Sequence, residues 1–136
     1  MEKSVGLVLY RDTPDGKVYL LLHYRGGHWD FPKGHVKKGE KEKETAVREL
    51  REETGITDGR IRAGFKDRTE YSFRRNNRTV AKEVVYYIAR TRTADVWLSA
   101  EHQGSAWLPA RAAARKLTFE SSRRILGRAK AAIEEE

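Results

Sequence analysis

Three glutamates, Glu49, Glu52 and Glu53, stand at positions i, i+3 and i+4 of the 136-residue chain. If the segment is helical, this spacing places all three carboxylates on one face of the helix. Like charges at close range repel one another, so such a face is either fully solvated or neutralised by a divalent cation. Carboxylate oxygens in a chain without cysteine favour Mg²⁺ or Mn²⁺ over zinc. The spacing alone leaves both the solvated face and the metal site open.

The segment that carries these glutamates is predicted to be a helix over Glu40–Thr54. It contains neither glycine nor proline, and Ala46, Val47 and Leu50 recur at helical spacing. These three apolar residues are expected to face a sheet and to hold the helix in place. Gly55 follows directly and predicts where the helix ends.

The remaining elements must build the scaffold that positions this helix. Strands are predicted at apolar, β-branched runs, namely Val5–Tyr10, Val18–Tyr24, Ile61–Phe65, Thr69–Phe73, Val80–Ala89 and Gly104–Leu108. Trp29–Gly39 has the proline and glycine content of an ordered loop, and Arg74–Arg78 predicts a polar turn. Pro109–Leu117 predicts one or two helical turns, and Ser121–Ile133 a terminal amphipathic helix. Because strands and helices do not alternate regularly, a single α+β domain over residues 1–136 is favoured.

The composition excludes several classes of protein. The chain is 38% hydrophobic and has no cysteine, which excludes a disulfide scaffold and a thiolate metal site. No apolar stretch approaches the roughly 20 residues that span a bilayer, and the N-terminus lacks the long apolar region of a signal peptide. We therefore expect a soluble, cytoplasmic protein with no membrane partner.

The formal net charge of +8 is unevenly distributed. Residues 30–59 hold 7 basic and 8 acidic side chains, whereas residues 60–92 hold 10 basic and 3 acidic ones. A carboxylate-rich block followed by a basic block suits a polyanionic ligand held near metal ions. The alternative is a solvated basic face that binds nothing.

A long motif overlaps the three glutamates. Residues 34–56 read GHVKKGEKEKETAVRELREETGI. This segment resembles the Nudix box, G-x5-E-x7-R-E-U-x-E-E-x-G-U, where U is a bulky aliphatic residue, and every defined position is matched. The resemblance implies the Nudix fold, a mixed β-sheet sandwiched between helices (α/β/α), with a loop–helix–loop that carries the box. It also implies cleavage of a pyrophosphate bond in a nucleoside diphosphate linked to another group.

The resemblance assigns roles to residues of the box and its surroundings. The metal ligands it implies for Mg²⁺ or Mn²⁺ are Glu49, Glu52, Glu53 and the backbone carbonyl of Lys33. Arg48 is expected to pair with a neighbouring carboxylate and hold its rotamer. Gly34 would let the chain turn tightly, Gly55 would end the helix, and Glu40 would orient its neighbours, although a role as base stays open. The general base is either a carboxylate of the box or Glu101, so the expected catalytic set is Glu49, Glu52, Arg48 and Glu101.

Segments outside the box narrow the substrate. They are WDFPKGHV at 29–36, KEVVYY at 82–87, SAEHQ at 99–103 and LTFESS at 117–122. Together they resemble asymmetric diadenosine tetraphosphate hydrolases, which implies release of ATP and AMP. The substrate-binding residues we expect are Lys33, His35 and Lys82 for phosphate, and Tyr87 and Phe119 for the base. Core packing is the alternative for Tyr87 and the preferred role for Tyr86, whereas Tyr71 and Phe73 fit either role.

Other functions remain open at this stage. The basic block would also suit removal of pyrophosphate from RNA 5′ ends, although the Lys33-Gly34-His35 segment favours the dinucleotide. Hydrolysis of oxidised nucleoside triphosphates is a further enzymatic alternative. A nucleotide-sensing or RNA-binding module is the non-enzymatic one, but it would be expected to lack a box carboxylate. Arg74, Arg75 and Arg78 are either solvated or reach the far end of a long polyphosphate, and we expect a monomer or weak dimer.

Overall fold

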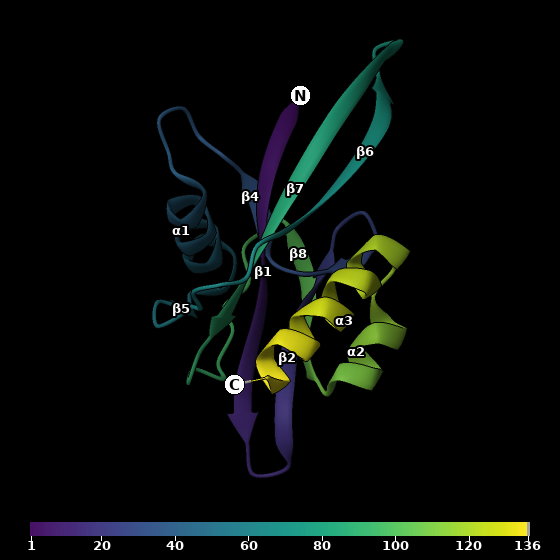
Figure 1. Ribbon diagram of the computed structural model, residues 1–136. Coiled ribbons are helices and arrows are strands. Elements are labelled where there is room, and N and C mark those ends of the chain that lie inside the picture. Colours follow the sequence, from purple (N-terminus) through teal and green to yellow (C-terminus); the bar gives the residue numbers. More distant parts are fainter. Residues whose placement is uncertain (136) are drawn as a thin grey trace.

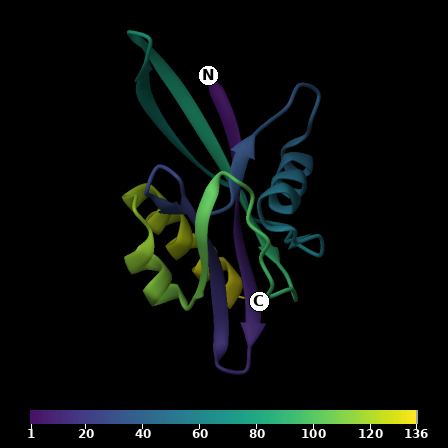
Figure 2. The ribbon, with the colours of Figure 1, turned by 180° about the vertical axis from the view of Figure 1, so that it is seen from behind.

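The computed structural model describes residues 1–135, which form a sheet with helices on both faces (Figures 1 and 2). Helix α1 (Glu42–Thr54) packs on one face, and α2 (Ala110–Lys116) and α3 (Glu120–Glu134) pack on the other. This arrangement confirms the α+β prediction of a sheet sandwiched between helices. Among the described residues, no helix is both long enough and apolar enough to cross a membrane.

The sheet has eight strands and is mixed. They are β1 Glu2–Thr13, β2 Gly16–Tyr24, β3 Trp29–Asp30, β4 Lys33–His35, β5 Arg60–Ile61, β6 Asp67–Arg75, β7 Arg78–Arg90 and β8 His102–Leu108. The central order is β3-β2-β1-β7-β5, with β4 paired to β1, β6 to β7 and β8 to β2. Strands β1 and β7 run parallel, whereas every other pair is antiparallel.

Alternate side chains of β1 pack into two separate hydrophobic cores. Val8 and Tyr10 pack with α3, while Leu7 and Leu9 pack on the opposite face with α1. Full burial of a large aliphatic side chain contributes roughly 1.5–3 kcal/mol, so both helical layers are firmly docked. Helix α1 faces the sheet through Ala46 and Leu50. Val47 is 45% exposed, so the prediction that Val47 also contacts the sheet is wrong. One residue on from Ala46, a side chain has turned about 100° away from that face.

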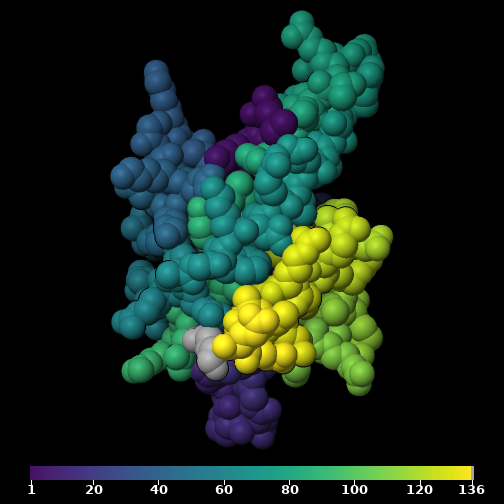
Figure 3. Space-filling model, viewed as in Figure 1, coloured from purple at the N-terminus to yellow at the C-terminus, as the bar shows by residue number. Residues whose placement is uncertain are grey.

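Several elements differ from the prediction in type or in length. Trp29–Gly39, expected as a loop, contains the short strands β3 and β4, because their partners on β2 and β1 complete the hydrogen bonding. The strand expected at Ile61–Phe65 shortens to β5. The turn expected at Arg74–Arg78 tightens to Asn76 and Asn77, whose φ angles of 51° and 63° suit a two-residue hairpin. The β6–β7 hairpin therefore extends beyond the body of the molecule (Figures 1 and 3).

Candidate active site

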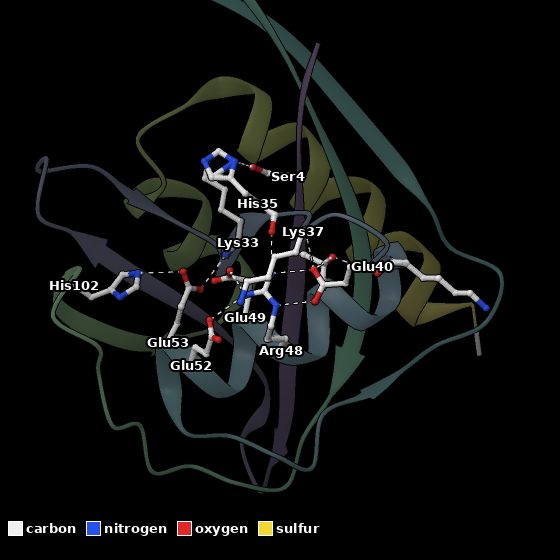
Figure 4. Close-up of polar contacts among 12 residues, drawn as sticks. Ser4, Lys33, His35, Lys37, Glu40, Arg48, Glu49, Glu52, Glu53 and His102 are labelled. Atoms are coloured by element: carbon white, nitrogen blue, oxygen red, sulfur yellow. Dashed lines mark hydrogen bonds and ion pairs between the residues drawn. The ribbon is translucent and has the colours of Figure 1, made fainter.

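A pocket of about 790 Å³ lies between α1, β4 and β7. It brings together most of the residues expected from the sequence, namely Lys33, Gly34, His35, Glu49, Glu52, Glu53, Lys82 and Glu101. Four carboxylates therefore share one cavity with three lysines, Lys33, Lys37 and Lys82. Figure 4 shows the three box glutamates directed toward the same space from α1.

The C-terminal end of α1 is held by two features. Gly55 has a φ of 76°, and its N–H donates to the Arg51 carbonyl at 2.8 Å, so the predicted helix end is confirmed. The loop after β7 then crosses this end, where the N–H groups of Trp97 and Ser99 donate to the carbonyls of Thr54 and Glu53. These bonds bring the Ser99–Glu101 segment to the acidic side of the pocket.

Arg48 links the carboxylates of the site. Its guanidinium donates to both oxygens of Glu40 at 2.7 and 3.0 Å, to Glu49 at 2.7 Å and to Glu52 at 3.0 Å. It also donates to the His35 carbonyl at 2.9 Å, which joins α1 to β4 (Figure 4). Hydrogen bonds from Arg48 and its neighbours lower the pKa of Glu40 to about 2. Arg48 thus holds Glu49 and Glu52 in place, as expected, and Glu40 in turn positions Arg48.

Gly34 is required for space and not for a turn. It lies inside β4 opposite Val5, in extended pairing. A Cβ at this position would overlap the side-chain carboxylate of Glu49. The structure therefore corrects the expected role of Gly34: the missing side chain makes room for Glu49.

Glu53 is the buried carboxylate of the group, with 2% exposure. Its Oε1 accepts the Lys33 N–H at 3.1 Å. Burial raises the pKa of Glu53 to about 9, and the charges of Glu49 and Glu101 add to that shift. The negative charges of Glu49, Glu53 and Glu101 repel one another until a cation neutralises them.

His102 adjoins Glu53 and was missed by the sequence reasoning. Its Nδ1 lies 2.9 Å from Ser99 Oγ, and its Nε2 lies 3.7 Å from Glu53 Oε2. The Nε2 atom is buried and has no hydrogen-bond partner within residues 1–135. Because the backbone N–H of Glu101 donates to Ser99 Oγ at 3.4 Å, the serine proton is available to Nδ1. With Ser99 donating to Nδ1, the proton of the neutral imidazole is on Nε2, the ring atom nearest Glu53.

The donor set fits a hard divalent cation. Glu49, Glu52 and Glu53 supply oxygen alone, which suits Mg²⁺ or Mn²⁺, and Glu101 adds a fourth carboxylate to the pocket. Within residues 1–135, no three acidic or histidine side chains already lie at metal-binding separations, and Arg48 Nη1 bonds both Glu49 and Glu52. A cation would therefore use the carboxylate oxygens that Arg48 leaves open.

The basic side of the pocket suits phosphate. Burial and the nearby charge of Lys33 lower the pKa of Lys82. The Lys33 ammonium pairs with the buried Asp30 at 2.9 Å, and His35 Nδ1 lies 3.3 Å from Ser4 Oγ. An anion in the pocket would relieve the repulsion between the two lysines.

A second pocket of about 440 Å³ adjoins the first and shares His28, Lys33 and Tyr71 with it. Tyr86 and the 43%-exposed Phe119 also line it, and the Phe119 ring lies 5.5 Å from that of His28. Flat, largely apolar walls beside a phosphate site suit a nucleobase. Phe119 is thus placed as expected, whereas sequence reasoning missed His28 and left Tyr71 undecided.

Tyr87 lines neither pocket, which corrects its expected contact with substrate. It is 6% exposed on the α1 side of the sheet, where its hydroxyl donates to Glu42 at 2.5 Å. Tyr86, its neighbour on β7, points to the other face and lines the second pocket. Alternation along the strand predicts that the two tyrosines diverge, but it does not predict which one faces the ligand.

A third cavity, of about 540 Å³, lies far from this site between the β1–β2 hairpin and the C-terminal end of α3. Two of its cations, Lys17 and Arg90, pair with Asp12 at 3.1 and 2.7 Å. It contains neither the box carboxylates nor a basic wall facing them. The first pocket, which contains the box carboxylates, is therefore the candidate active site.

Comparisons with known proteins agree with this geometry. Residues 2–128 match the family model described as NUDIX domain. The bis(5'-nucleosyl)-tetraphosphatase [asymmetrical] of Rattus norvegicus is 36% identical over 136 residues, covering 91% of this chain and 90% of the relative. The Caenorhabditis elegans protein of the same name is 39% identical over 108 residues, covering 77% of each. A crystal structure of a C. elegans Ap4A hydrolase binary complex has a TM-score of 0.88 at 30% identity, with both chains fully covered.

Proposed function

The chain belongs to the Nudix family, and from this membership we propose that it cleaves diadenosine tetraphosphate asymmetrically into ATP and AMP. The observation that carries the proposal is the shared pocket: four carboxylates, two of them bonded to Arg48, line one cavity with Lys33 and Lys82, beside an aromatic pocket. The tetraphosphatases that resemble the chain over most of its length support the same substrate.

Glu49, Glu52 and Glu53 are the residues that would hold Mg²⁺ or Mn²⁺, with the Lys33 carbonyl as the further ligand expected from the box. The bound cation supplies charge neutralisation at phosphate and lowers the pKa of water. Arg48 keeps Glu49 and Glu52 oriented. The His102 ring, with Nε2 3.7 Å from Glu53 Oε2, packs beside that carboxylate.

The basic and aromatic residues bind and orient the substrate. Lys82, Lys33 and His35 contact the phosphate chain, while one adenine stacks in the second pocket beside Phe119. Glu101 is the carboxylate outside the box that lines the pocket and takes the proton from the attacking water. Because one nucleoside enters the aromatic pocket and the other does not, the two halves of the substrate are treated unequally.

Product analysis tests this proposal. Purified protein with Mg²⁺ should convert diadenosine tetraphosphate into equal amounts of ATP and AMP and should stop when EDTA is added. Ordinary and oxidised nucleoside triphosphates are the comparison substrates, and we expect them to be cleaved more slowly. Formation of ADP alone, or tight binding with no cleavage, would contradict the proposed reaction, and the second outcome would indicate a nucleotide sensor.

The cytoplasmic location and the monomeric or weakly dimeric state expected from the sequence stay predictions. Size-exclusion chromatography with light scattering tests the second of them.

A further inference from the structure

A group of arginines lies at the end of β7 that is remote from the active-site pocket. It consists of Arg11 of β1, Arg60 of β5, Arg90 of β7 and Arg92 just after β7, and we name these four residues the arginine cluster. Arg90 is eight positions after Lys82 on β7, which is about 26 Å at the usual rise of a strand. Because Lys82 lines the active-site pocket, the cluster lies well away from the proposed site of cleavage.

Two contiguous cavities are lined by the arginine cluster. The first, of about 280 Å³, contains Arg60, and the second, of about 230 Å³, contains Arg11. Arg90, Thr91 and Arg92 line both of them. Among the described residues, neither cavity shares a lining residue with the two pockets of the candidate active site. The cluster therefore surrounds a space of its own.

The acidic side chain of the first cavity is engaged by neutral donors. Asp58 Oδ2 accepts the backbone N–H of Arg92 at 3.0 Å, and its Oδ1 accepts the hydroxyl groups of Thr91 and Thr93. Within residues 1–135, the Asp58 carboxylate pairs with no arginine side chain. Asp58 thus holds the backbone at Arg92 and leaves the Arg60 side chain without a paired carboxylate.

The second cavity also holds more positive than negative charge. Its acidic residue, Asp12, pairs with Arg90 at 2.7 Å and with Lys17 at 3.1 Å. The other three members of the arginine cluster have no ion-pair partner within the part of the chain that the structure describes. Two carboxylates, Asp12 and Asp58, are thus set against four guanidinium groups, so the lining of the two cavities carries an excess of positive charge.

The free cluster contains an unfavourable interaction that an anion would relieve. Arg60 and Arg90 are directly opposite each other on antiparallel strands, where like charges weaken the pairing. Arg11 is held by an aromatic contact and not by an ion pair, since its guanidinium lies 4.9 Å from the centre of the Trp107 ring. Its Nε atom is buried and has no hydrogen-bond partner among residues 1–135. This arrangement keeps positive charge in place without neutralising it, as an anion-binding site requires.

We propose that the arginine cluster is a second anion site, which binds inorganic pyrophosphate or the phosphate chain of a nucleotide without a metal ion. Guanidinium groups donate paired hydrogen bonds to phosphate oxygens and stay charged throughout the working pH range of proteins. The active-site pocket differs, because its four carboxylates repel a free anion until a cation is bound. The inference goes beyond the proposed function and holds whichever substrate the first pocket cleaves.

Nitrogen-15 NMR locates the site without relying on activity. Pyrophosphate is titrated into the protein in EDTA at constant ionic strength, so that neither divalent cations nor cleavage contributes. The backbone amide signals of Thr91 and Arg92 and the Nε signal of Arg11 should shift and saturate. These positions are far from Lys82, so binding in the active-site pocket does not account for their shifts. The absence of a saturable shift at the cluster would overturn the proposal.

The double variant Arg60→Gln/Arg92→Gln should raise the Kd for pyrophosphate at least about tenfold, the usual effect of losing a hydrogen bond to a charged group. Arg111→Gln/Arg124→Gln is the matched control, because it removes the same charge at exposed positions of α2 and α3. Its Kd should stay within about twofold of the parent value, since solvent screens remote charges. Equal weakening by the two double variants would show that only the net charge matters, and the proposal would be wrong.

Thermal melts give a second measurement, which a purely structural role of the arginines would not affect. Pyrophosphate at about ten times its Kd should raise the midpoint of the parent protein by about 5 °C. The Arg60→Gln/Arg92→Gln protein should lose this rise, and without pyrophosphate it should melt no lower than the parent, because the repulsion between Arg60 and Arg90 is removed. If pyrophosphate stabilises the variant as much as the parent, the proposal fails.

A parallel titration with ATP in EDTA identifies the source of the anion. A Kd for ATP at or below that for pyrophosphate indicates a nucleotide site, and a higher one indicates a site for free pyrophosphate. Either result supports a second anion site. If neither anion shifts the signals of the cluster, the site does not exist, and the proposed cleavage in the first pocket is unaffected.

Discussion

Arg48 makes five hydrogen bonds, and their number explains why arginine is needed at this position. A planar guanidinium can contact two or more carboxylates in fixed directions, whereas an ammonium is a compact point charge. Glu40 satisfies one edge of Arg48, so its remaining edge is directed at Glu49 and Glu52. The geometry of two proposed ligands therefore depends on a residue that need not touch the metal.

Arg48→Lys should lower Mg²⁺ affinity or turnover about 10- to 100-fold, the usual cost of losing an orienting contact. The charge is kept, so a purely electrostatic role would leave both quantities nearly unchanged. Mg²⁺ titration by calorimetry and the Mg²⁺ dependence of kcat measure the effect. Arg51→Lys, at an exposed position of the same helix, is the control.

Gly34→Ala should displace the Glu49 carboxylate, because the added Cβ would occupy its position. We expect a loss of Mg²⁺ affinity together with about 1–3 kcal/mol of stability, the usual cost of overpacking. Calorimetry and urea unfolding measure the two effects. Gly127→Ala in α3 meets no atom within 4 Å and should instead stabilise by up to about 1 kcal/mol. A variant of Gly34 that binds Mg²⁺ normally would refute the close-contact explanation.

Helix α1 is docked by polar contacts at its first turn as well as by its apolar face. Glu42 accepts from Tyr87 of β7 at 2.5 Å and pairs with Lys3 of β1 and with Lys66. Burial alone would raise the pKa of Glu42, but its hydrogen bonds from Lys3, Tyr87 and Lys66 lower it to about 2. The element that carries the box is thus attached to both central strands.

Acid should weaken this attachment. Since the pKa of Glu42 in the fold lies below its ordinary value of 4.5, its contribution to stability is complete above that value and is lost as pH falls toward 2. Urea unfolding between pH 6 and pH 3 should show a steeper fall for the parent than for Glu42→Gln. Parallel curves for the two proteins would mean that Glu42 does not couple folding to pH. Glu44→Gln, on an exposed side chain of the same turn, is the control.

At the scale of the whole molecule, the fold brings together acidic and basic residues that are far apart in the sequence. Lys82 from the basic stretch 60–92 shares one pocket with the carboxylates of α1 because β7 lies in the sheet beside β1, against which both α1 and β4 pack. Repulsion among the carboxylates is built into the fold before any ligand arrives. Ligands of opposite sign on each side should therefore stabilise the whole domain.

Mg²⁺ should raise the thermal midpoint of the protein. A ligand at about 100 times its Kd stabilises by about 2.7 kcal/mol, which for a domain of this size is on the order of 10 °C. Thermal melts with Mg²⁺ and with EDTA measure this shift without relying on activity. Glu52→Gln, which removes one charge at nearly constant volume, should reduce the shift. An equal rise in both proteins would argue against Glu52 as a ligand.

The sequence by itself determined the helix of the box and the common face of its three glutamates, because helical spacing is a local property of the chain. It also predicted the end of that helix at Gly55, where a left-handed residue is needed. The overall class, with a sheet between helices, followed from the pattern of strands and from the resemblance of residues 34–56 to the Nudix box.

Only the tertiary structure decided which side chains meet the ligand. Alternation along a strand predicts that Tyr86 and Tyr87 point to opposite faces of the sheet. Which face each one points to is decided only when α1 packs on one face and α3 on the other. His102 meets Glu53 across 49 positions of sequence, and Gly34 meets Glu49 across 15. Such contacts depend on strand register and helix docking, which are global properties of the fold, and no local pattern contains them.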